Sequence, residues 1–231
     1  MSVVIPTYNE AGSIRGVVDK FFETGAVDEV VVVDNNALGN TREEVTKTKA
    51  RLVHEQKQGY GHAIMRGLKE AKGDLIVVTE GDGTFQSKDI EKFLSYSDEF
   101  DVVLGSRTSR EIMWEGAFMP YPVRFGNWLW AKWVEILFDG PVLTDIGCTY
   151  KLVSRKALNK VIDMFTLSRG DGTFNPEFII WLLRRRVKAV EIPIIYKERV
   201  GKSMYTGSIW RAFKLGLKMV PVILKYLFKK I

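Results

Sequence analysis

Cysteine and histidine are scarce in this sequence. Its 231 residues include one cysteine, Cys148, and two histidines, His54 and His62. A single cysteine excludes an intrachain disulfide framework and a cysteine-rich zinc site, and two histidines leave little for a histidine-based metal site. The longest apolar stretch, near the C-terminus, is interrupted by lysines and by Pro221. We therefore expect no ordinary membrane-spanning helix. Because the chain opens on a strand-like run at 2–5, we expect no signal peptide either.

The composition is typical of a soluble globular protein with a basic excess. Apolar residues make up 46% and charged residues 27%, which excludes disorder, a collagen-like fibre and a coiled coil as the main organisation. The 34 basic and 28 acidic residues give a net charge of +6. This charge would suit a nucleic-acid binder, but no nucleic-acid-binding motif accompanies it, and we expect no such partner. The length suits one large domain, or one domain with an appendage.

Strand-like and helix-like segments alternate through the first half of the chain. Apolar, β-branched runs predict strands at 2–5, 29–33, 50–54, 74–79 and 101–105, and amphipathic spacing predicts helices at 11–22, 41–50, 61–71 and 89–97. Such alternation is typical of parallel βαβ units with right-handed crossovers. Further along, we expect a helix at 175–186 and a strand at 189–193. The fold class is therefore α/β, an open and mostly parallel sheet flanked by helices.

Acidic residues follow the fourth expected strand. Glu80 and Asp82, separated by Gly81, come directly after the apolar run at 74–79. In open α/β sheets, ligands bind beyond the carboxyl ends of the strands, and two carboxylates there repel each other unless a cation lies between them. Hard oxygen ligands suit Mg²⁺ or Mn²⁺. The alternative is a solvated acidic turn.

Polar residues also follow the first two expected strands. Asp34, at the end of the second strand, is suited to a hydrogen bond with a ribose or a base edge, although an Asx-turn would explain it equally well. The run from Pro6 to Glu10 places the ring of Tyr8 next to a carboxylate. Its alternative is an N-capped loop that leads into a helix.

The order and spacing of these pieces resemble glycosyltransferase family 2 on a GT-A fold, and within it the dolichyl (polyprenyl) phosphate mannose and glucose synthases. The likeness covers roughly residues 2 to 206. The segments that carry it are VVIPTYNEAGSI, VVVDNNALGNT, QGYGHAIMRGLKEAKGDLIVVTEGDGTF, VVLGSR, TDIGCTYKL and EIPIIYKERVGKS. Each motif is weak alone, but their shared order is specific. The resemblance implies a GT-A domain at 1–206, and the remainder, 207–231, is a basic amphipathic helix.

The resemblance also implies roles for single residues. Glu80 and Asp82 would bind Mg²⁺ or Mn²⁺, although Glu80 and Asn35 each stand where the family usually has Asp. Asp145 would lie under the sugar and Glu177 on the acceptor side. The residues placed at the nucleotide are Pro6, Tyr8, Glu10, Val33, Asp34, Asn35 and Gly81, with Asp82 shared. The arginines placed near the donor diphosphate and the acceptor phosphate are Arg107, Arg124 and Arg199.

The function that the resemblance implies is an inverting, metal-dependent glycosyl transfer. A hexose would move from a GDP- or UDP-hexose to a polyprenyl phosphate, at the cytoplasmic face of a membrane where the protein is peripheral. A lipid phosphate is already largely ionised near neutral pH, because its second pKa is about 6. A glycan hydroxyl acceptor is the first alternative, and it would need Asp145 or Glu177 as a base. The second is a nucleotide-sugar-binding, membrane-docking protein without turnover.

Two segments are candidates for membrane contact. At about 100° per residue, the basic residues of the tail fall within a sector about 60° wide, and large apolar residues lie opposite. We expect Pro221 to bend or break this helix. The stretch 121–138 carries a second apolar surface with several tryptophans, which favour membrane interfaces. The alternatives are a tail packed on the protein and, for 121–138, ordinary core.

Overall fold

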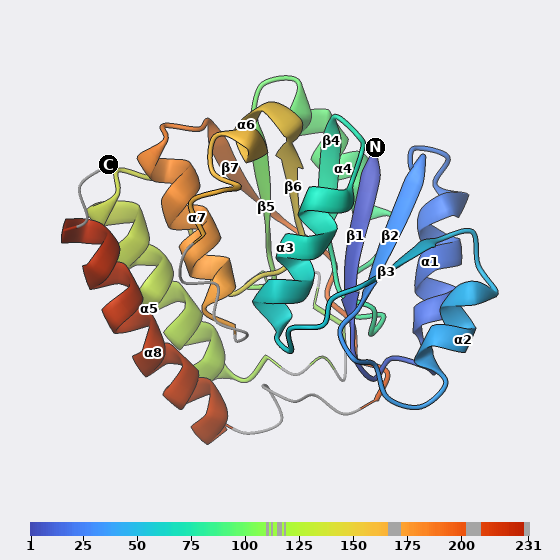
Figure 1. The fold of residues 1–231 in the computed structure, drawn as a ribbon. Helices are drawn as coiled ribbons and strands as arrows, with labels where there is room; N and C mark the ends of the chain where they lie inside the picture. Colours follow the sequence, from blue (N-terminus) through green and yellow to red (C-terminus); the bar gives the residue numbers. More distant parts are fainter. Residues whose placement is uncertain are drawn as a thin grey trace.

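The computed structural model describes residues 1–109, 111, 113–114, 117, 119–165, 172–201 and 209–228. Within these residues, seven strands form one sheet in the order β3-β2-β1-β4-β6-β5-β7 (Figure 1). All pairs are parallel except those of β6, which runs antiparallel between β4 and β5. The expected open, mostly parallel sheet is therefore confirmed. The strands are β1 (Ser2–Thr7), β2 (Glu29–Asp34), β3 (Arg51–His54), β4 (Leu75–Val78), β5 (Val102–Ser106), β6 (Lys151–Ser154) and β7 (Ala189–Pro193).

Helices cover both faces of the sheet. The helices are α1 (Ile14–Glu23), α2 (Thr41–Thr46), α3 (Tyr60–Glu70), α4 (Asp89–Ser97), α5 (Tyr121–Leu137), α6 (Arg155–Asn159), α7 (Phe174–Arg184) and α8 (Ile209–Phe228). One core cluster joins the sheet to α1 and α4, and another joins it to α3, α6 and α7. Strand residues alternate between the two clusters: Val102 and Leu104 belong to one and Val103 to the other. This is the period of two that strand geometry imposes.

The strands predicted from continuous apolar runs are central, as a sheet covered on both faces requires. In β2, the residues from Val30 to Val33 are all at most 1% exposed. The predicted helices are also present, with shifted ends. The α1 helix begins at Ile14 rather than at 11, because the carbonyl of Glu10 accepts from the amides of Ser13 and Ile14 in a preceding turn. The α2 helix ends at Thr46.

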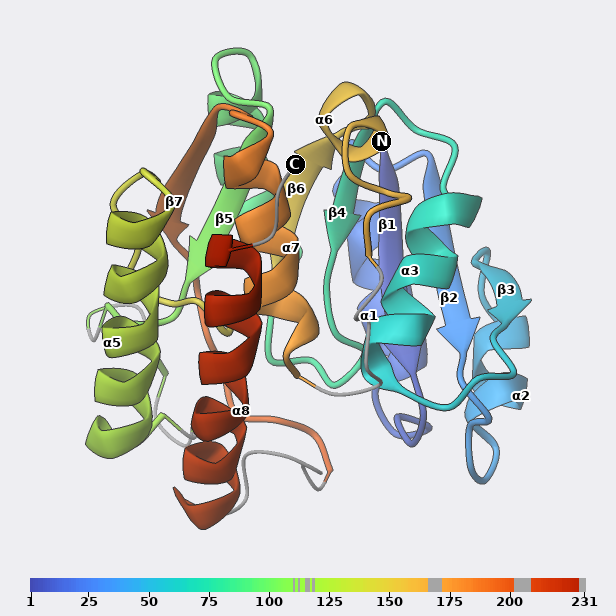
Figure 2. The same cartoon turned by 60° about the vertical axis from the view of Figure 1, so that its left-hand side comes forward.

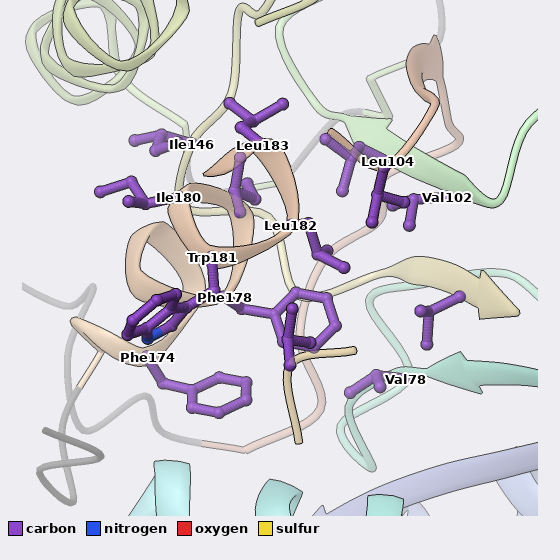
Figure 3. Packing of buried hydrophobic residues seen from close by; sticks show 14 of the residues in the cluster. Val78, Val102, Leu104, Ile146, Phe174, Phe178, Ile180, Trp181, Leu182 and Leu183 are labelled. Carbon is purple, nitrogen blue, oxygen red and sulfur yellow. The ribbon is translucent and has the colours of Figure 1, made fainter. Parts of the chain in front are cut away.

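The α7 helix lies inside the molecule. Its residues from Phe174 to Leu183 are all buried, as expected of a helix that is apolar around its whole circumference. Figure 3 shows its side chains packed toward Val78 of β4 and toward Val102 and Leu104 of β5. The other side of α7 faces α8, which shares the same core cluster. The first turn of α7 therefore lies between the sheet and the C-terminal helix.

The α5 and α8 helices lie side by side on one flank of the molecule (Figures 1 and 2). Trp130 of α5 packs so closely on Gly216 of α8 that a Cβ there would lie 2.9 Å from its Nε1. Pro221 lies inside α8 without ending it, so of the expected bend or break, the break is wrong. The helix continues because Met219, Val222 and Ile223, on either side of the proline, are buried in the core.

The α8 helix has three faces, where the sequence indicated two. One face packs on the protein through Met219, Val222, Ile223 and Tyr226. The large apolar residues predicted to lie opposite the basic residues form a second, exposed face, with Trp210 at 73% and Phe228 at 79%. Lys214, Lys218 and Lys225 are also exposed. Within the described residues, no helix is both long and apolar enough to cross a bilayer.

Candidate active site

Four strand ends bring the candidate residues together. In the sheet β2, β1 and β4 are neighbours and parallel, so Asp34, Thr7 and Glu80 leave the sheet at the same edge. Arg107 follows β5, which is parallel to β7 and separated from β4 by β6 alone. Because parallel strands end together, residues that are far apart in sequence meet at one edge, which is where ligands bind in such sheets.

Glu80 and Asp82 lie in the short loop after β4, and both contact Arg199. Asp82 is 1% exposed, and its Oδ1 accepts from the amide (3.0 Å) and the hydroxyl (2.7 Å) of Thr84. Glu80 Oε1 accepts from the Thr149 hydroxyl at 2.7 Å. Burial raises the pKa of Glu80 to about 7, the neighbouring Asp82 adds to the rise, and Arg199 opposes it. Hydrogen bonds therefore hold both side chains in place, while burial and mutual repulsion disfavour the ionised form of Glu80.

Arg199 joins the two carboxylates. Its Nη2 forms an ion pair with Asp82 Oδ2 and lies 3.3 Å from Glu80 Oε2. Attraction to these two groups outweighs burial and raises the pKa of Arg199 above its usual value. Arg199 was predicted to lie near a phosphate group, and its partners in this structure are the two carboxylates.

A buried network of polar side chains is hydrogen-bonded to Glu80. The sequence did not reveal this network. Thr149, which donates to Glu80, also bonds the hydroxyl of Tyr60. Asn175, in the first turn of α7, donates to Gly147 O and to Thr149, and its Oδ1 accepts from Lys151 Nζ at 2.7 Å. Burial lowers the pKa of Lys151 to about 8. The one signal available was a lysine opening the apolar run KLVS.

Asp145 and Arg107 are paired with each other. Asp145 Oδ2 accepts from the amide and Nε of Arg107 (3.0 and 2.7 Å), and Oδ1 accepts from Nη2 at 2.9 Å. The Asp145 side chain is fully buried and that of Arg107 is 11% exposed. Glu191 holds the loop from below by accepting from the amides of Thr144 and Asp145. The two residues expected at sugar and diphosphate thus form one closed ion pair.

Asp34 and Asn35 hold loops. Asp34 Oδ1 accepts from the Ala37 amide at 2.6 Å, a local bond to the backbone three residues on, where an Asx-turn would use the amide two residues on. Its Oδ2 lies 2.6 Å from Arg42 Nε and 2.9 Å from His54 Nδ1. Asn35 accepts from the Gly59 amide and donates to the carbonyls of residues 55 and 57. A nucleotide that contacts Asp34 would therefore have to exchange with Arg42 or His54.

The other residues expected at the nucleotide lie at the same edge of the sheet, and their side chains are held by different contacts. Glu10 Oε2 accepts from Thr7 Oγ1 and from the amides of Tyr8 and Asn9, so it closes the loop after β1. Pro6 lies one residue before the end of this strand and pairs with Val33 of β2. The Val33 side chain is fully buried beside Ala63, which leaves its backbone as the part that could meet a ligand.

Close packing, and not backbone strain, leaves little room for a side chain at Gly81. A Cβ there would lie 3.0 Å from Ile14 Cδ1 and 3.4 Å from Ile5 Cγ2, and the Gly81 carbonyl accepts from the Ser13 hydroxyl at 2.7 Å. The start of α1 is thereby fastened to the loop that carries Glu80 and Asp82.

Arg124 and Glu177 make contacts with aromatic residues of the helices. Arg124 lies in the first turns of α5, with its guanidinium 5.7 Å from the ring centre of Tyr121. Glu177 is 1% exposed, and its Oε1 accepts from the Tyr226 hydroxyl at 2.6 Å. Cys148 is 3% exposed, and burial raises the pKa of its thiol to about 12, so the thiol stays protonated and is no nucleophile.

The Glu80–Asp82 pair suits a divalent cation. Asp82 Oδ2 is buried, and the group that contacts it is the positively charged guanidinium of Arg199 rather than a neutral hydrogen-bond donor. Within the described residues no group of three or more His, Cys, Asp or Glu could hold a metal. Phosphate oxygens and waters would have to complete the ligand set, as they commonly do for Mg²⁺.

Comparison with known proteins identifies the family of the chain. The model of the family described as Glycosyl transferase family 2 matches residues 2–162, a span that holds the carboxylate pair and the Arg107–Asp145 pair. The chain belongs to this family. It is a glycosyltransferase, which confirms the resemblance seen in the motifs and removes the alternative without turnover.

Similar proteins act on sugars. The chain is 30% identical over 208 residues to a dolichyl-phosphate hexose transferase of Haloferax volcanii, covering 88% of this chain and 85% of that protein. It is 25% identical to the dolichyl-phosphate beta-glucosyltransferase of Saccharomyces cerevisiae (98% of this chain, 75% of that one). It is also 26% identical to the low-salt glycan biosynthesis hexosyltransferase Agl6 of Haloferax volcanii, of which it spans 54%.

Solved structures confirm the expected GT-A-like fold. Glucosyl-3-phosphoglycerate synthase from Mycobacterium tuberculosis, in complex with Mn²⁺, UDP and phosphoglyceric acid, superposes with a TM-score of 0.74 at 16% identity. The match covers all of this chain and 79% of the other. The same enzyme with Mg²⁺ and UDP gives a TM-score of 0.72. At such low identity the likeness establishes the fold.

Proposed function

We propose that this glycosyltransferase moves a hexose from a nucleotide diphosphate-sugar to a polyprenyl phosphate, with inversion at the anomeric carbon, while bound peripherally to a membrane surface. Family membership already establishes glycosyl transfer. The observation that carries the rest is a flank of exposed aromatic and aliphatic side chains on α5 and α8. The names of two similar proteins, both dolichyl-phosphate transferases, support the same acceptor class.

The exposed flank is too extensive for chance exposure of single residues. From here on, "the aromatic flank" denotes the exposed large apolar residues of α5 and α8. On α5 these include Tyr121, Phe125 and Trp128, whose rings stack in sequence at 6.3 and 5.9 Å. Large contiguous apolar surfaces mark binding sites, and aromatic residues beside lysines favour lipid headgroups. The members are Tyr121, Phe125, Trp128, Leu129, Trp133, Ile136, Leu137, Trp210, Phe213, Leu217, Leu224, Leu227 and Phe228.

The burial of both candidate bases favours a phosphate acceptor over a hydroxyl. A hydroxyl acceptor needs a base within reach of its proton, and the two carboxylates considered for that role are Asp145 and Glu177. Asp145 is 2% exposed and bound by Arg107 on both oxygens, and Glu177 is 1% exposed. A lipid phosphate, already ionised near neutral pH, needs no proton removed.

The reaction follows from these charges. An oxygen of the acceptor phosphate attacks the anomeric carbon, the bond from that carbon to the β-phosphate oxygen breaks, and the nucleoside diphosphate leaves. Glu80 and Asp82 would hold a divalent cation, which neutralises charge on the departing diphosphate. Arg199 lies beside them, and its guanidinium would bind a phosphate group of the donor. The attack proceeds from the opposite face, which inverts the configuration.

A donor screen tests the reaction. The enzyme is incubated with radiolabelled GDP- and UDP-hexoses, a short polyprenyl phosphate, and Mn²⁺ or Mg²⁺, and the products are extracted into organic solvent. Label in the organic phase, lost in Asp82→Asn, is the expected result. Label that remains entirely in the aqueous phase with every donor, but moves onto an added glycan, would refute the lipid acceptor.

A flotation assay tests the flank independently of turnover. Trp133→Ser removes an aromatic residue of the aromatic flank that is 43% exposed, and Tyr96→Ser removes one of equal exposure, 43%, from α4. We expect about a tenfold loss of binding to anionic vesicles for the first, equivalent to about 1.4 kcal/mol, and no change for the second. Equal vesicle binding by both variants would contradict the proposed surface.

A further inference from the structure

One guanidinium nitrogen occupies the space between the two candidate metal ligands. Arg199 Nη2 contacts Asp82 Oδ2 and lies 3.3 Å from Glu80 Oε2. A cation shared by these two carboxylates would have to stand between the same oxygens. The side chain of Arg199 is 28% exposed and that of Asp82 2% exposed, so the arginine lies between Asp82 and solvent, while the side chain of Glu80 is itself 25% exposed.

The backbone around Arg199 is fastened to the loop that carries the carboxylates. The amide of Val200 donates to Asp82 O at 3.0 Å, and the amide of Lys197 donates to Thr84 O at 2.9 Å. These bonds hold the chain on both sides of Arg199. The guanidinium can therefore leave the carboxylates by side-chain rotation, without movement of the strand or the loop.

We propose that Arg199 is an internal counter-ion of the Glu80–Asp82 pair, and that a divalent cation binds tightly only after a nucleotide diphosphate has drawn this guanidinium away. The inference rests on the proposed function and deepens it, because it makes metal binding depend on the donor. In the free enzyme the arginine neutralises the pair. In the donor complex it binds the diphosphate, and the cation takes its place.

The charges at this edge of the sheet support the exchange. A divalent cation added while Arg199 stays in place would meet a like charge within a few ångströms, which disfavours binding. The neighbouring cation Arg107 is already paired with Asp145, and Lys151 is held by Asn175. A diphosphate offers Arg199 the bidentate, charge-assisted hydrogen bonds that guanidinium groups form best. Its oxygens also complete the ligand set of the cation.

Thermodynamic linkage turns this arrangement into a measurable signature. If the nucleotide relieves the competition, it raises the affinity for the cation, and the cation raises the affinity for the nucleotide by the same factor. Removing the guanidinium should change the two affinities in opposite directions: the cation alone binds more tightly, and the nucleotide alone binds more weakly. A residue that merely stabilises the fold would not produce opposite signs.

Titration with Mn²⁺, followed by the electron paramagnetic resonance signal of the free ion, tests the proposal on the full chain. We expect Arg199→Gln to bind Mn²⁺ alone at least tenfold more tightly than the wild type, and UDP or GDP alone about tenfold more weakly. Arg199→Lys, which keeps a cation beside the pair, should retain weak Mn²⁺ binding. Arg66→Gln is the matched control, since it removes an exposed arginine of a surface ion pair on α3 and should leave both affinities unchanged.

The outcomes separate this proposal from the metal site itself. Equal Mn²⁺ affinity in the wild type and Arg199→Gln, with binding that Asp82→Asn abolishes, would overturn the counter-ion and leave the metal site standing. Absence of Mn²⁺ binding in both proteins, even with saturating nucleotide, would overturn the metal site and the counter-ion together. Tighter Mn²⁺ binding in Arg199→Gln without any loss of nucleotide affinity would overturn the exchange with the diphosphate.

Discussion

Replacing Asp145 with asparagine tests whether this carboxylate serves the fold through Arg107. The amide keeps the shape and one carbonyl oxygen, but it removes the charge that neutralises the guanidinium of Arg107, whose side chain is 11% exposed. Breaking a buried ion pair from one side costs about 3–5 kcal/mol. Because Asp145 accepts three hydrogen bonds from Arg107 and the amide can retain some of them, we expect the lower end, about 3 kcal/mol.

Urea unfolding followed by circular dichroism measures this loss. With a slope of about 2 kcal/mol per molar urea, the midpoint should fall by about 1.5 M at an unchanged slope. Asp19→Asn is the matched control, since Asp19 pairs with Arg15 at 3.9 Å on the surface of α1, where both side chains are about half exposed. That exposed pair should contribute less than about 0.5 kcal/mol.

The double variant Asp145→Asn/Arg107→Gln completes the test. Because the second change removes the uncompensated charge, the double variant should lose less stability than the two single changes added together, by about 0.5–3 kcal/mol. If Asp145→Asn unfolds at the wild-type urea concentration while transfer activity is lost, the pairing is not structural and Asp145 acts on the sugar or the acceptor.

Three further results are expected. Gly67→Ala should lower the stability measured by thermal unfolding by about 1–3 kcal/mol, because the added Cβ would lie 2.2 Å from Val4 Cγ1. Gly16→Ala is the control and should not lower stability, since the space around Gly16 is open. Equal stability of the two variants would contradict the close packing of α3 on β1. The thiol of Cys148, whose pKa is raised to about 12, should resist a thiol reagent at pH 8 in the native protein and react after denaturation. Rapid labelling of Cys148 in the native protein would instead show an accessible thiolate and contradict this expectation. Glu80, with a pKa of about 7, is protonated in the folded state between its ordinary pKa and 7, so it favours folding at low pH and this contribution is lost as the pH rises through 7. Cation binding requires the ionised form, so Mn²⁺ affinity measured with nucleotide should fall up to about tenfold per pH unit below 7, and a pH-independent affinity would refute this ionisation.

Much of the fold was predictable because its signals are local. The run EVVVV at 29–33 identified a strand buried on both faces, and the structure places it as β2, second from the edge of the sheet. The acidic residues after β4 were predicted to share one edge of the sheet because parallel strands end together. The sequence also indicated the basic and apolar sides of the C-terminal helix, although it could not show that a third face, including Ile223 and Tyr226, binds the core.

The partners within the site were not predictable, because they depend on which distant segments the folded chain brings together. Arg199 meets Glu80 across 119 positions, and Tyr60 meets Thr149 across 89. No periodicity records such pairs. The same holds for Asp145, whose sequence context gave a place near the sugar but no hint that Arg107 would bind both of its oxygens.

The sequence by itself determined the class of fold, the family and the set of charged residues at the strand ends, since each of these is encoded in short stretches of chain. Tertiary structure alone decided how those charges neutralise one another. The insertion of the antiparallel β6 between β4 and β5 carries Thr149 and Lys151 beneath Glu80, and the return of the chain after β7 lays Arg199 over the carboxylate pair. A side chain's protonation and availability depend on burial and on neighbours within a few ångströms, and those neighbours come from the whole chain.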